Sequence, residues 1–225
     1  MRLRKLHSWD LTPSEAIELQ KRLADRVVNE GSPGEVRFVG AADVAFVDRR
    51  WPRQPSLALA AVVLMTYPSL EVVERHVIEA PVTFPYIPGL LSFREIPVLA
   101  RAFEQLKQAP DLLLADGQGV AHPRRFGLAC HLGLLTGVPT IGVAKSRLCG
   151  EHGPLPVEVG ARIPLEDKGE MIGIVLRTRS GVAPLYISVG HLIGLKDAAD
   201  WTLRLCRGYR LPEPARAVDR LSKGL

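Results

Sequence analysis

The hydrophobic residues of this chain fall into short runs that predict strands, separated by stretches with helical spacing. Residues 57–65 are almost continuously apolar, as is typical of a strand in the middle of a sheet. The short link Pro68-Ser69 predicts an antiparallel turn between this strand and the next. Strands are predicted over residues 37–47, 57–67, 70–80, 112–115, 138–143, 171–177 and 185–189.

Helical spacing fills most of the remaining chain. The first helix has a clear start signal, with Thr12 as N-cap, Pro13 in the first turn and Glu15 three residues after the cap. Helices are predicted over residues 13–28, 96–108, 124–135, 198–207 and 215–223. Three antiparallel strands followed by alternating helices and strands indicate an α/β fold with a mixed central sheet flanked by helices. No repeat or linker divides the chain, so we expect one domain over residues 1–225.

A single acid, Asp116, ends the apolar run over residues 112–115. Glycines and then basic side chains follow it in the sequence DGQGVAHPRR. A buried strand that carries a carboxylate to its C-terminal end suits a metal and phosphate site, because ligands of open α/β sheets collect at that edge. The glycines allow a substrate to approach the backbone. Taken alone, Asp116 has a simpler alternative, in which it begins an ordinary turn.

Two other acids stand in unusual surroundings. Asp43 lies within the otherwise apolar strand VGAADVAF, where an uncompensated carboxylate carries a large desolvation penalty. We favour a ligand role for it over a half-exposed position on the polar face of the strand. Glu95 belongs to Ser92-x-x-Glu95, which matches a helix capping box. Because Pro97 would then fall past the first turn, we expect the helix to begin near residues 96–97, which leaves Glu95 free to face a site.

Two further charged residues follow predicted strands. Lys145 comes directly after the apolar sequence IGVA, where an ammonium group can stabilise the charge on a phosphate. The alternative for Lys145 is an exposed position at the strand end, where most lysines lie. Asp48, beside Arg49 and Arg50, is interpreted as solvation of a strand end.

Composition favours a globular protein with an acidic partner. The 225 residues are 47% hydrophobic and 24% charged, which excludes a disordered chain. A net charge of +5 favours nucleic acid over a membrane surface. The three cysteines have no Cys-x-x-Cys spacing, so they support neither a disulfide framework nor a zinc cluster. No apolar run reaches the roughly 18 residues of a membrane span, and no apolar signal core follows the basic N-terminus, so we expect a cytoplasmic protein.

Together these segments resemble the endonuclease V family of inosine-directed repair nucleases. The resemblance rests on GAADVAF around Asp43, PYIPGLLSFRE through Glu95, LLLADGQGVAHPRRFGLA around Asp116, TIGVAKSRL around Lys145 and GYRLPEPARAVD through Asp219. The segments occur in the family's order and cover most of the chain from about residue 36 to residue 220. Asp219 occupies a position where some members carry His.

The resemblance implies an RNase H-like fold, in which the first and fourth strands are neighbours and Asp43 can meet Asp116. It also implies a Mg²⁺-dependent endonuclease, with Mn²⁺ as a substitute ion, that recognises deoxyinosine in double- or single-stranded DNA. Hydrolysis is expected at the second phosphodiester bond 3′ to the lesion, leaving 3′-hydroxyl and 5′-phosphate ends. The carboxylates of Asp43 and Asp116 are the hard oxygen ligands that Mg²⁺ prefers, and the choice between one ion and two stays open. The implied catalytic residues are Asp43, Glu95, Asp116, Lys145 and Asp219.

The loop Tyr86-Ile87-Pro88 suits a wedge that enters the DNA stack when a base flips out. Packing of this loop onto its helix is the alternative. The resemblance implies the wedge, and it also implies a pocket for the extruded base. We expect this pocket to be lined by Gly89, Leu91, Gly117, Gly127 and Leu128. We expect His122, Arg124 and Arg125 to contact phosphate, with solvent exposure at a helix start as the alternative for the two arginines.

Two other functions are considered beside this one. The first is the same chemistry on inosine-containing RNA. The second is a non-catalytic inosine-binding module, which is disfavoured because four acids near a bound phosphate repel one another unless a metal joins them. We expect a monomer that does not bind membranes.

Overall fold

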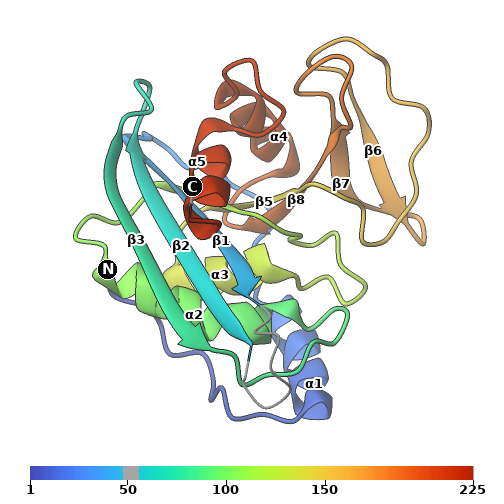
Figure 1. The fold of residues 1–225 in the computed structure, drawn as a ribbon. Coiled ribbons are helices and arrows are strands. Elements are labelled where there is room, and N and C mark those ends of the chain that lie inside the picture. Colours follow the sequence, from blue (N-terminus) through green and yellow to red (C-terminus); the bar gives the residue numbers. More distant parts are fainter. Residues whose placement is uncertain (48–55, 225) are drawn as a thin grey trace.

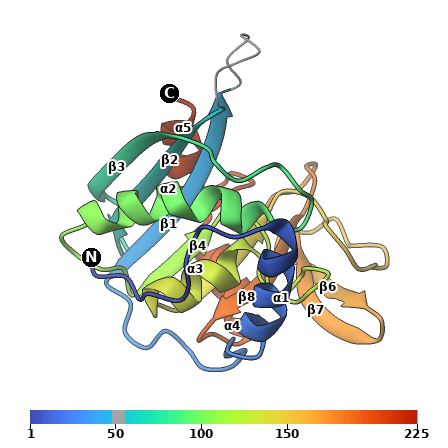
Figure 2. The same ribbon diagram turned by 90° about the horizontal axis from the view of Figure 1, so that it is seen from below.

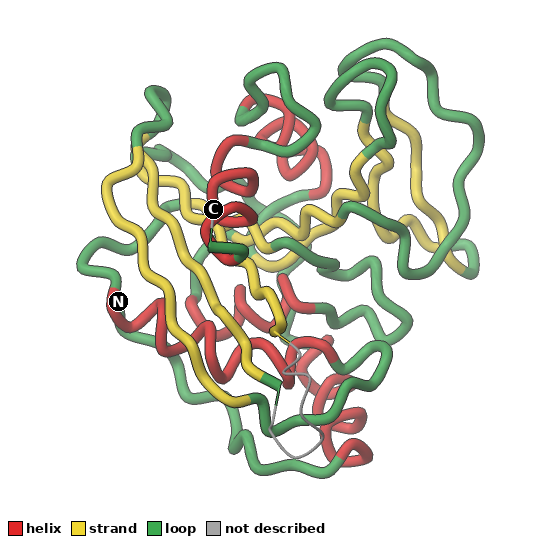
Figure 3. The backbone as a smooth tube through the Cα atoms, viewed as in Figure 1, coloured by secondary structure: helices red, strands yellow, loops and turns green. Residues whose placement is uncertain are grey.

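A mixed sheet in the order β3-β2-β1-β4-β5-β8-β7-β6 forms the centre of the computed structural model, which describes residues 1–47 and 56–224 (Figure 1 and Figure 3). The first three strands pair antiparallel, β1 and β5 each pair parallel with β4, and the remaining strands pair antiparallel. This arrangement confirms the expected mixed α/β sheet. The strands are β1 (Phe38–Val47), β2 (Leu57–Thr66), β3 (Val72–Pro81), β4 (Leu112–Ala115), β5 (Thr140–Ala144), β6 (Arg162–Asp167), β7 (Glu170–Leu176) and β8 (Leu185–His191).

Helices cover both faces of the sheet, and each face has an apolar core of its own. Side chains alternate along β1, so Ala41 packs toward α4 and α5 whereas Ala42 packs toward α2 and α3. Figure 2 shows α2 and α3 lying across one face, and α1 packs against them on the side away from the sheet. Within the described residues, no helix is long and apolar enough to cross a membrane. The helices are α1 (Pro13–Ala24), α2 (Leu91–Gln105), α3 (Leu128–Thr136), α4 (Leu195–Arg204) and α5 (Glu213–Ser222).

The start of α2 differs from the expectation. The helix begins at Leu91 rather than near residues 96–97, and Pro97 lies inside it. Pro97 removes the N–H that would bond the Phe93 carbonyl, but the buried side chains of Phe93 and Ile96 extend the apolar face of the helix across the proline. The Ser92 hydroxyl does not cap the helix and instead lies 3.1 Å from the imidazole Nδ1 of a buried histidine on α3. The capping box at Thr12 and Glu15 is present as predicted.

Two other helix boundaries differ by four residues, and one strand was not predicted. Helix α3 begins at Leu128 rather than at residue 124, because residues 122–127 form a tight turn in which Arg125 has a positive φ of 54°. Helix α1 ends four residues early, because the Val28 amide turns away to bond a side chain of β8. Strand β6 was not predicted, since Leu165 is its only buried residue and its pattern is that of an exposed edge strand. The interpretation of Asp48 concerns a residue outside the described ranges.

Candidate active site

The parallel pairing of β1 with β4 brings two carboxylates together. Ala42 lies opposite Ala115, and the Asp116 amide donates a hydrogen bond to the Ala42 carbonyl at 3.1 Å. The residues that follow these alanines, Asp43 and Asp116, therefore lie side by side toward the carboxyl ends of the two strands. Asp43 points to the same face as Ala41, toward α5, and it is 9% exposed.

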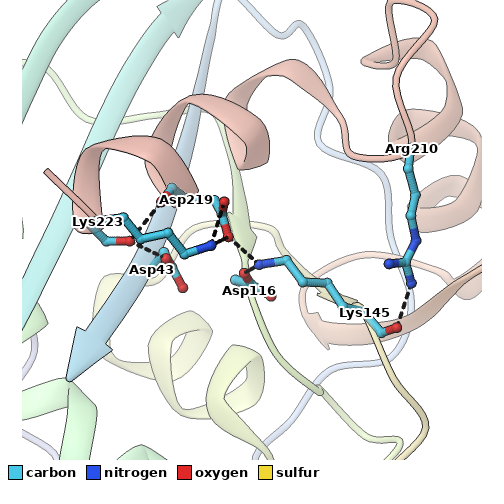
Figure 4. Close-up of polar contacts among 7 residues, drawn as sticks. Asp43, Asp116, Lys145, Arg210, Asp219 and Lys223 are labelled. Carbon is cyan, nitrogen blue, oxygen red and sulfur yellow. Dashed lines mark hydrogen bonds and ion pairs between the residues drawn. The ribbon is translucent and has the colours of Figure 1, made fainter. Parts of the chain in front are cut away.

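Helix α5 supplies the third carboxylate. Ala215 and Val218 are buried against the sheet, and the next residue, Asp219, faces the strand ends beside them. Oxygen atoms of Asp43, Asp116 and Asp219 all lie within 4.8 Å of one another (Figure 4). The hydroxyl of Ser222, one turn further along α5, donates to Asp43 Oδ2 at 2.5 Å and ties the helix to β1. We call these three aspartates the acidic cluster.

Two lysines face the acidic cluster. Lys145 follows β5, and its ammonium group contacts both Asp116 and Asp219 (Figure 4). Burial opposes its charge, but the hydrogen bonds and negative charges of the two aspartates outweigh burial and raise the pKa of Lys145. Lys223 donates to both carboxylate oxygens of Asp219, at 2.8 and 2.9 Å. Burial raises the pKa of Asp219, but its hydrogen bonds to Lys145 and Lys223 lower it further, so the net shift is downward.

Arg210 and Lys223 were missed by the sequence analysis. The Arg210 guanidinium donates to the Lys145 carbonyl at 2.6 Å and to the Pro184 carbonyl at 2.8 Å, so it fixes the backbone that carries Lys145. Arg210 lies within GYRLPEPARAVD, a segment that carries the resemblance, but nothing in the sequence assigned this arginine a role. The signal for Lys223 was its position four residues after Asp219, where side chains on a helix meet.

Negative charge accumulates in this site. Glu95 approaches from α2, is 5% exposed, and has its pKa raised well above the usual value, by burial first and then by the charges of Asp43 and Asp116. Burial and the neighbouring Asp43 raise the pKa of Asp116 to about 6, despite the opposing contact with Lys145. Carboxylates this close together repel one another, and the arrangement is favourable only when cations balance their negative charge. The clustered, hard oxygen donors fit a divalent cation such as Mg²⁺.

A cavity of about 140 Å³ lies beside the turn that follows Asp116. The wedge residues Tyr86, Ile87 and Pro88 line it, and Tyr86 is 71% exposed. Gly117 does not line the cavity but lies against the side chain of Leu128, which does, and an added Cβ on Gly117 would be 3.3 Å from that side chain. Four of the five residues expected in the base pocket line this cavity: Gly89, Leu91, Gly127 and Leu128.

Several lining residues were not anticipated. Gln118, in the DGQG sequence, donates from Nε2 to the Ser146 carbonyl at 2.8 Å, and its Oε1 is buried with no hydrogen-bond partner in the described part of the chain. Because Ser146 follows Lys145, this bond links the cavity to the acidic cluster. Leu148, the last residue of the segment TIGVAKSRL, and Gln20, which lies outside all of the quoted segments, also line the cavity.

The side chains expected to bind phosphate are engaged with protein groups. His122 Nε2 and an Arg124 nitrogen lie 3.0 and 2.7 Å from the Gly89 carbonyl oxygen. Burial first, and then the charge of Arg124, lower the pKa of His122 to about 4, so its imidazole is neutral at pH 7. Arg125 binds Glu170 at 2.6 Å and Asp167 at 2.9 Å. A phosphate contact by these residues stays a prediction.

Comparison with known proteins identifies the family. The family model described as Endonuclease V matches residues 21–220. The chain belongs to the endonuclease V family. A relative from Gloeobacter violaceus, named endonuclease V, is 52% identical over 219 residues, which cover 96% of this chain and 87% of the relative.

Solved structures of endonuclease V share the fold. The protein from Bacillus subtilis matches with a TM-score of 0.94 at 28% identity, over 100% of this chain and 96% of that one. The Ciona intestinalis endonuclease V, in complex with a 24mer DNA containing an inosine followed by a ribo-adenosine, matches with a TM-score of 0.79 at 27% identity, over 94% and 96% of the two chains. The Argonaute of Aquifex aeolicus shares the fold alone, with a TM-score of 0.52 at 15% identity over 88% of this chain and 30% of that one. These likenesses agree with the RNase H-like architecture that was expected.

The charge balance of this endonuclease V site yields a prediction about stability. In metal-free protein, we expect Glu95→Gln to raise the free energy of unfolding at pH 8 and to change it little at pH 4. Folding raises the pKa of Glu95 above its usual value of 4.5. As pH rises past 4.5, the unfolded chain releases this proton before the folded state does, so the free energy of unfolding falls. Glutamine carries no charge and escapes this loss.

Urea unfolding in EDTA at the two pH values measures the effect. Glu104→Gln, at an exposed position on the same helix, is the matched control and should change stability at neither pH. A Glu95→Gln variant that is less stable than wild type at pH 8 would contradict this account of the charge.

Proposed function

We propose that this endonuclease V recognises deoxyinosine in DNA and hydrolyses the second phosphodiester bond 3′ to it, leaving 3′-hydroxyl and 5′-phosphate ends. One observation carries the proposal: an acidic cluster with oxygen atoms within 4.8 Å lies beside a cavity lined by an exposed aromatic loop. Family membership and the inosine-containing DNA bound by the Ciona relative support the substrate.

The acidic cluster would hold the metal. Asp43, Asp116 and Asp219 offer carboxylate oxygens, and Mg²⁺ is the proposed ion, with Mn²⁺ as a substitute. When bound, a divalent cation acidifies a water molecule and neutralises charge that develops on the phosphate. Asp219 belongs to this donor set beside the two ligands expected from the sequence.

The remaining charged residues would have three different roles around the scissile phosphate. Lys145 keeps its proton, because its pKa is raised, and its ammonium group stabilises negative charge on the phosphate or on the leaving oxygen. Arg210 holds the Lys145 backbone in place through the carbonyl bond. Burial and the charges of Asp43 and Asp116 raise the pKa of Glu95 well above its usual value. A carboxyl group with a raised pKa is suited to hold a proton or to accept one from a water molecule.

The cavity would receive the extruded base. Tyr86 is exposed and lies two residues before the rigid Pro88, so the loop can fill the space that a flipped base leaves in the stack. Flipping is easiest at a weak pair, such as one that contains a deaminated base. Gly89, Gly127 and Leu128 line the cavity. The Gly127 amide already donates to the Gly119 carbonyl at 3.0 Å, so the backbone amides of Gly89 and Leu128 would read the edge of hypoxanthine.

Inosine-containing RNA is the second candidate substrate. The observation that favours it is the ribo-adenosine that follows the inosine in the DNA bound by the Ciona relative. Cleavage of matched duplexes and single strands that carry either deoxyinosine or inosine distinguishes the two substrates. Binding without cleavage of either would instead support an inosine-binding module.

The first prediction from the proposed function tests the acidic cluster and the proposed activity together. Wild-type protein should nick an end-labelled duplex with one deoxyinosine in Mg²⁺, and should not nick it in EDTA or nick the undamaged duplex. Asp43→Asn or Asp116→Asn should abolish nicking while the protein stays folded, because each change removes a ligand charge but no core volume. Asp10→Asn, at an exposed position, removes the same charge and should cut normally. Wild-type turnover by either cluster variant would overturn the assignment.

A second prediction concerns Lys145. If its ammonium group stabilises the transition state, Lys145→Ala should lower the single-turnover rate at saturating enzyme by roughly 10²–10³. Lys196→Ala removes an exposed lysine and serves as the control, with an unchanged rate. A Lys145→Ala variant that weakens DNA binding but keeps the saturated rate would place Lys145 on ground-state phosphate only.

The third prediction tests the wedge. Tyr86→Ala should weaken discrimination between lesion and normal duplex by about 1–3 kcal/mol, the contribution of one base–aromatic stack. Tyr86→Phe keeps the ring and should discriminate like wild type. The deficit of Tyr86→Ala should shrink on single-stranded deoxyinosine substrate, where no base pair has to open. Equal losses on single and double strands would show that Tyr86 packs the loop or contacts the base directly.

A further inference from the structure

A buried glutamine connects helix α1 to the walls of the cavity. Gln20 lies among the apolar residues Ala16, Leu19 and Leu23 on the inner face of α1 and is 1% exposed. A polar side chain at such a position is unfavourable unless its hydrogen bonds are satisfied. Gln20 lies just outside the range 21–220 that matches the family model, and no motif in the sequence drew attention to it.

All of the hydrogen bonds of the Gln20 side chain go to two of the loops that line the cavity. Its Nε2 donates to the carbonyls of Gly89 and Phe126, at 2.9 and 3.0 Å. Its Oε1 accepts from Arg124 Nε at 2.6 Å. Gly89 directly follows the wedge residues, and Phe126 directly precedes the cavity residue Gly127. One side chain therefore joins these two loops.

The Gly89 carbonyl is the centre of this network. It faces three donor groups, on Gln20, His122 and Arg124. The Arg124 amide donates to His122 Nδ1 at 3.1 Å, so the imidazole carries its proton on Nε2 and donates to Gly89. Gly89 has a φ of +80°, and an added Cβ would lie 2.7 Å from the Arg124 guanidinium. These contacts between protein groups hold the loop after the wedge in one conformation before any base enters the cavity.

We propose that Gln20 is a positioning residue for lesion recognition, which sets the cavity between residues 86–90 and 122–127 before the base arrives. This inference rests on the proposed role of the cavity as a base pocket. A wall that is already ordered loses less conformational freedom on binding, so the network raises affinity for the extruded base by ordering the walls of the cavity. Loss of Gln20 should therefore weaken binding of the lesion and spare the chemical step, which takes place at the acidic cluster.

Two substitutions separate the parts of the network. Gln20→Met keeps length and volume but removes all three hydrogen bonds. Gln20→Glu keeps an acceptor for Arg124 but presents carboxylate oxygens to the Gly89 and Phe126 carbonyls. The matched control is Leu23→Ala, one turn further along α1, which loses buried apolar contacts in the same core without touching the network.

Hydrogen–deuterium exchange of the free protein gives a readout that needs no substrate. Gln20→Met should speed exchange in residues 86–90 and 122–127 while the sheet stays protected, and Leu23→Ala should loosen α1 without singling out these loops. Unchanged exchange in both loops for Gln20→Met would overturn the inference, whatever the protein cleaves.

Affinity and rate are then measured on a deoxyinosine duplex, with binding followed in Ca²⁺ and single-turnover cleavage at saturating enzyme in Mg²⁺. We expect both Gln20 variants to lose about tenfold or more in affinity, the scale of losing hydrogen bonds among buried groups, with a saturated rate within about threefold of wild type. Leu23→Ala should lower the melting temperature but keep the affinity. Wild-type affinity in Gln20→Glu, or an equal loss of affinity in Leu23→Ala, would overturn the inference. A wild-type protein that ignores deoxyinosine would instead overturn the proposed function, and the exchange result would tell the two failures apart.

Discussion

The parallel pairing of β1 with β4 is the contact on which the site depends. It sets Ala42 opposite Ala115, so Asp43 and Asp116 follow at the same edge of the sheet. A shift of one residue would turn Asp43 to the other face, away from α5 and Asp219. The pairing also forces like charges together, and Lys145, Lys223 and the Ser222 hydroxyl offset only part of the repulsion. The remaining negative charge favours binding of a divalent cation at the acidic cluster.

Close backbone packing is the second constraint, and it joins the cavity to the acidic cluster. The turn after Asp116 runs so near β5 and β8 that an added Cβ on Gly119 would lie 1.9 Å from the Val189 carbonyl, and one on Gly142 would lie 2.5 Å from the Gly119 amide. Gln118 then bonds the Ser146 carbonyl beside Lys145. Because these contacts fix the turn, the cavity and the carboxylates keep a constant separation. In the proposed function, this separation accounts for a cut at a fixed offset from the lesion.

The sequence reveals the parts of the site that continue strands and hides those that depend on tertiary contacts. Asp43, Asp116 and Lys145 were found because each lies in or directly after an apolar run, and runs of this kind predict strands well. The early start of α2 was missed, because burial of Phe93 and Ile96 outweighs the local effect of Pro97. The edge strand β6 lacks an apolar pattern. Gln20 gave no signal, and Arg210 gave none beyond its place in the segment GYRLPEPARAVD. Their partners, the Gly89 and Lys145 carbonyls, are backbone groups distant in sequence.

The central claim is that one rigid edge of the sheet carries both the metal site and the base pocket. The most direct test is a crystal structure of the protein with Mn²⁺ and an oligonucleotide that contains deoxyinosine, in which anomalous scattering locates the ion. The account predicts an anomalous peak bound by the carboxylates of Asp43, Asp116 and Asp219, with hypoxanthine in the cavity between residues 86–91 and 127–128. An ion bound away from these carboxylates, or a deoxyinosine that stays stacked in the DNA while the cavity is empty, would contradict it.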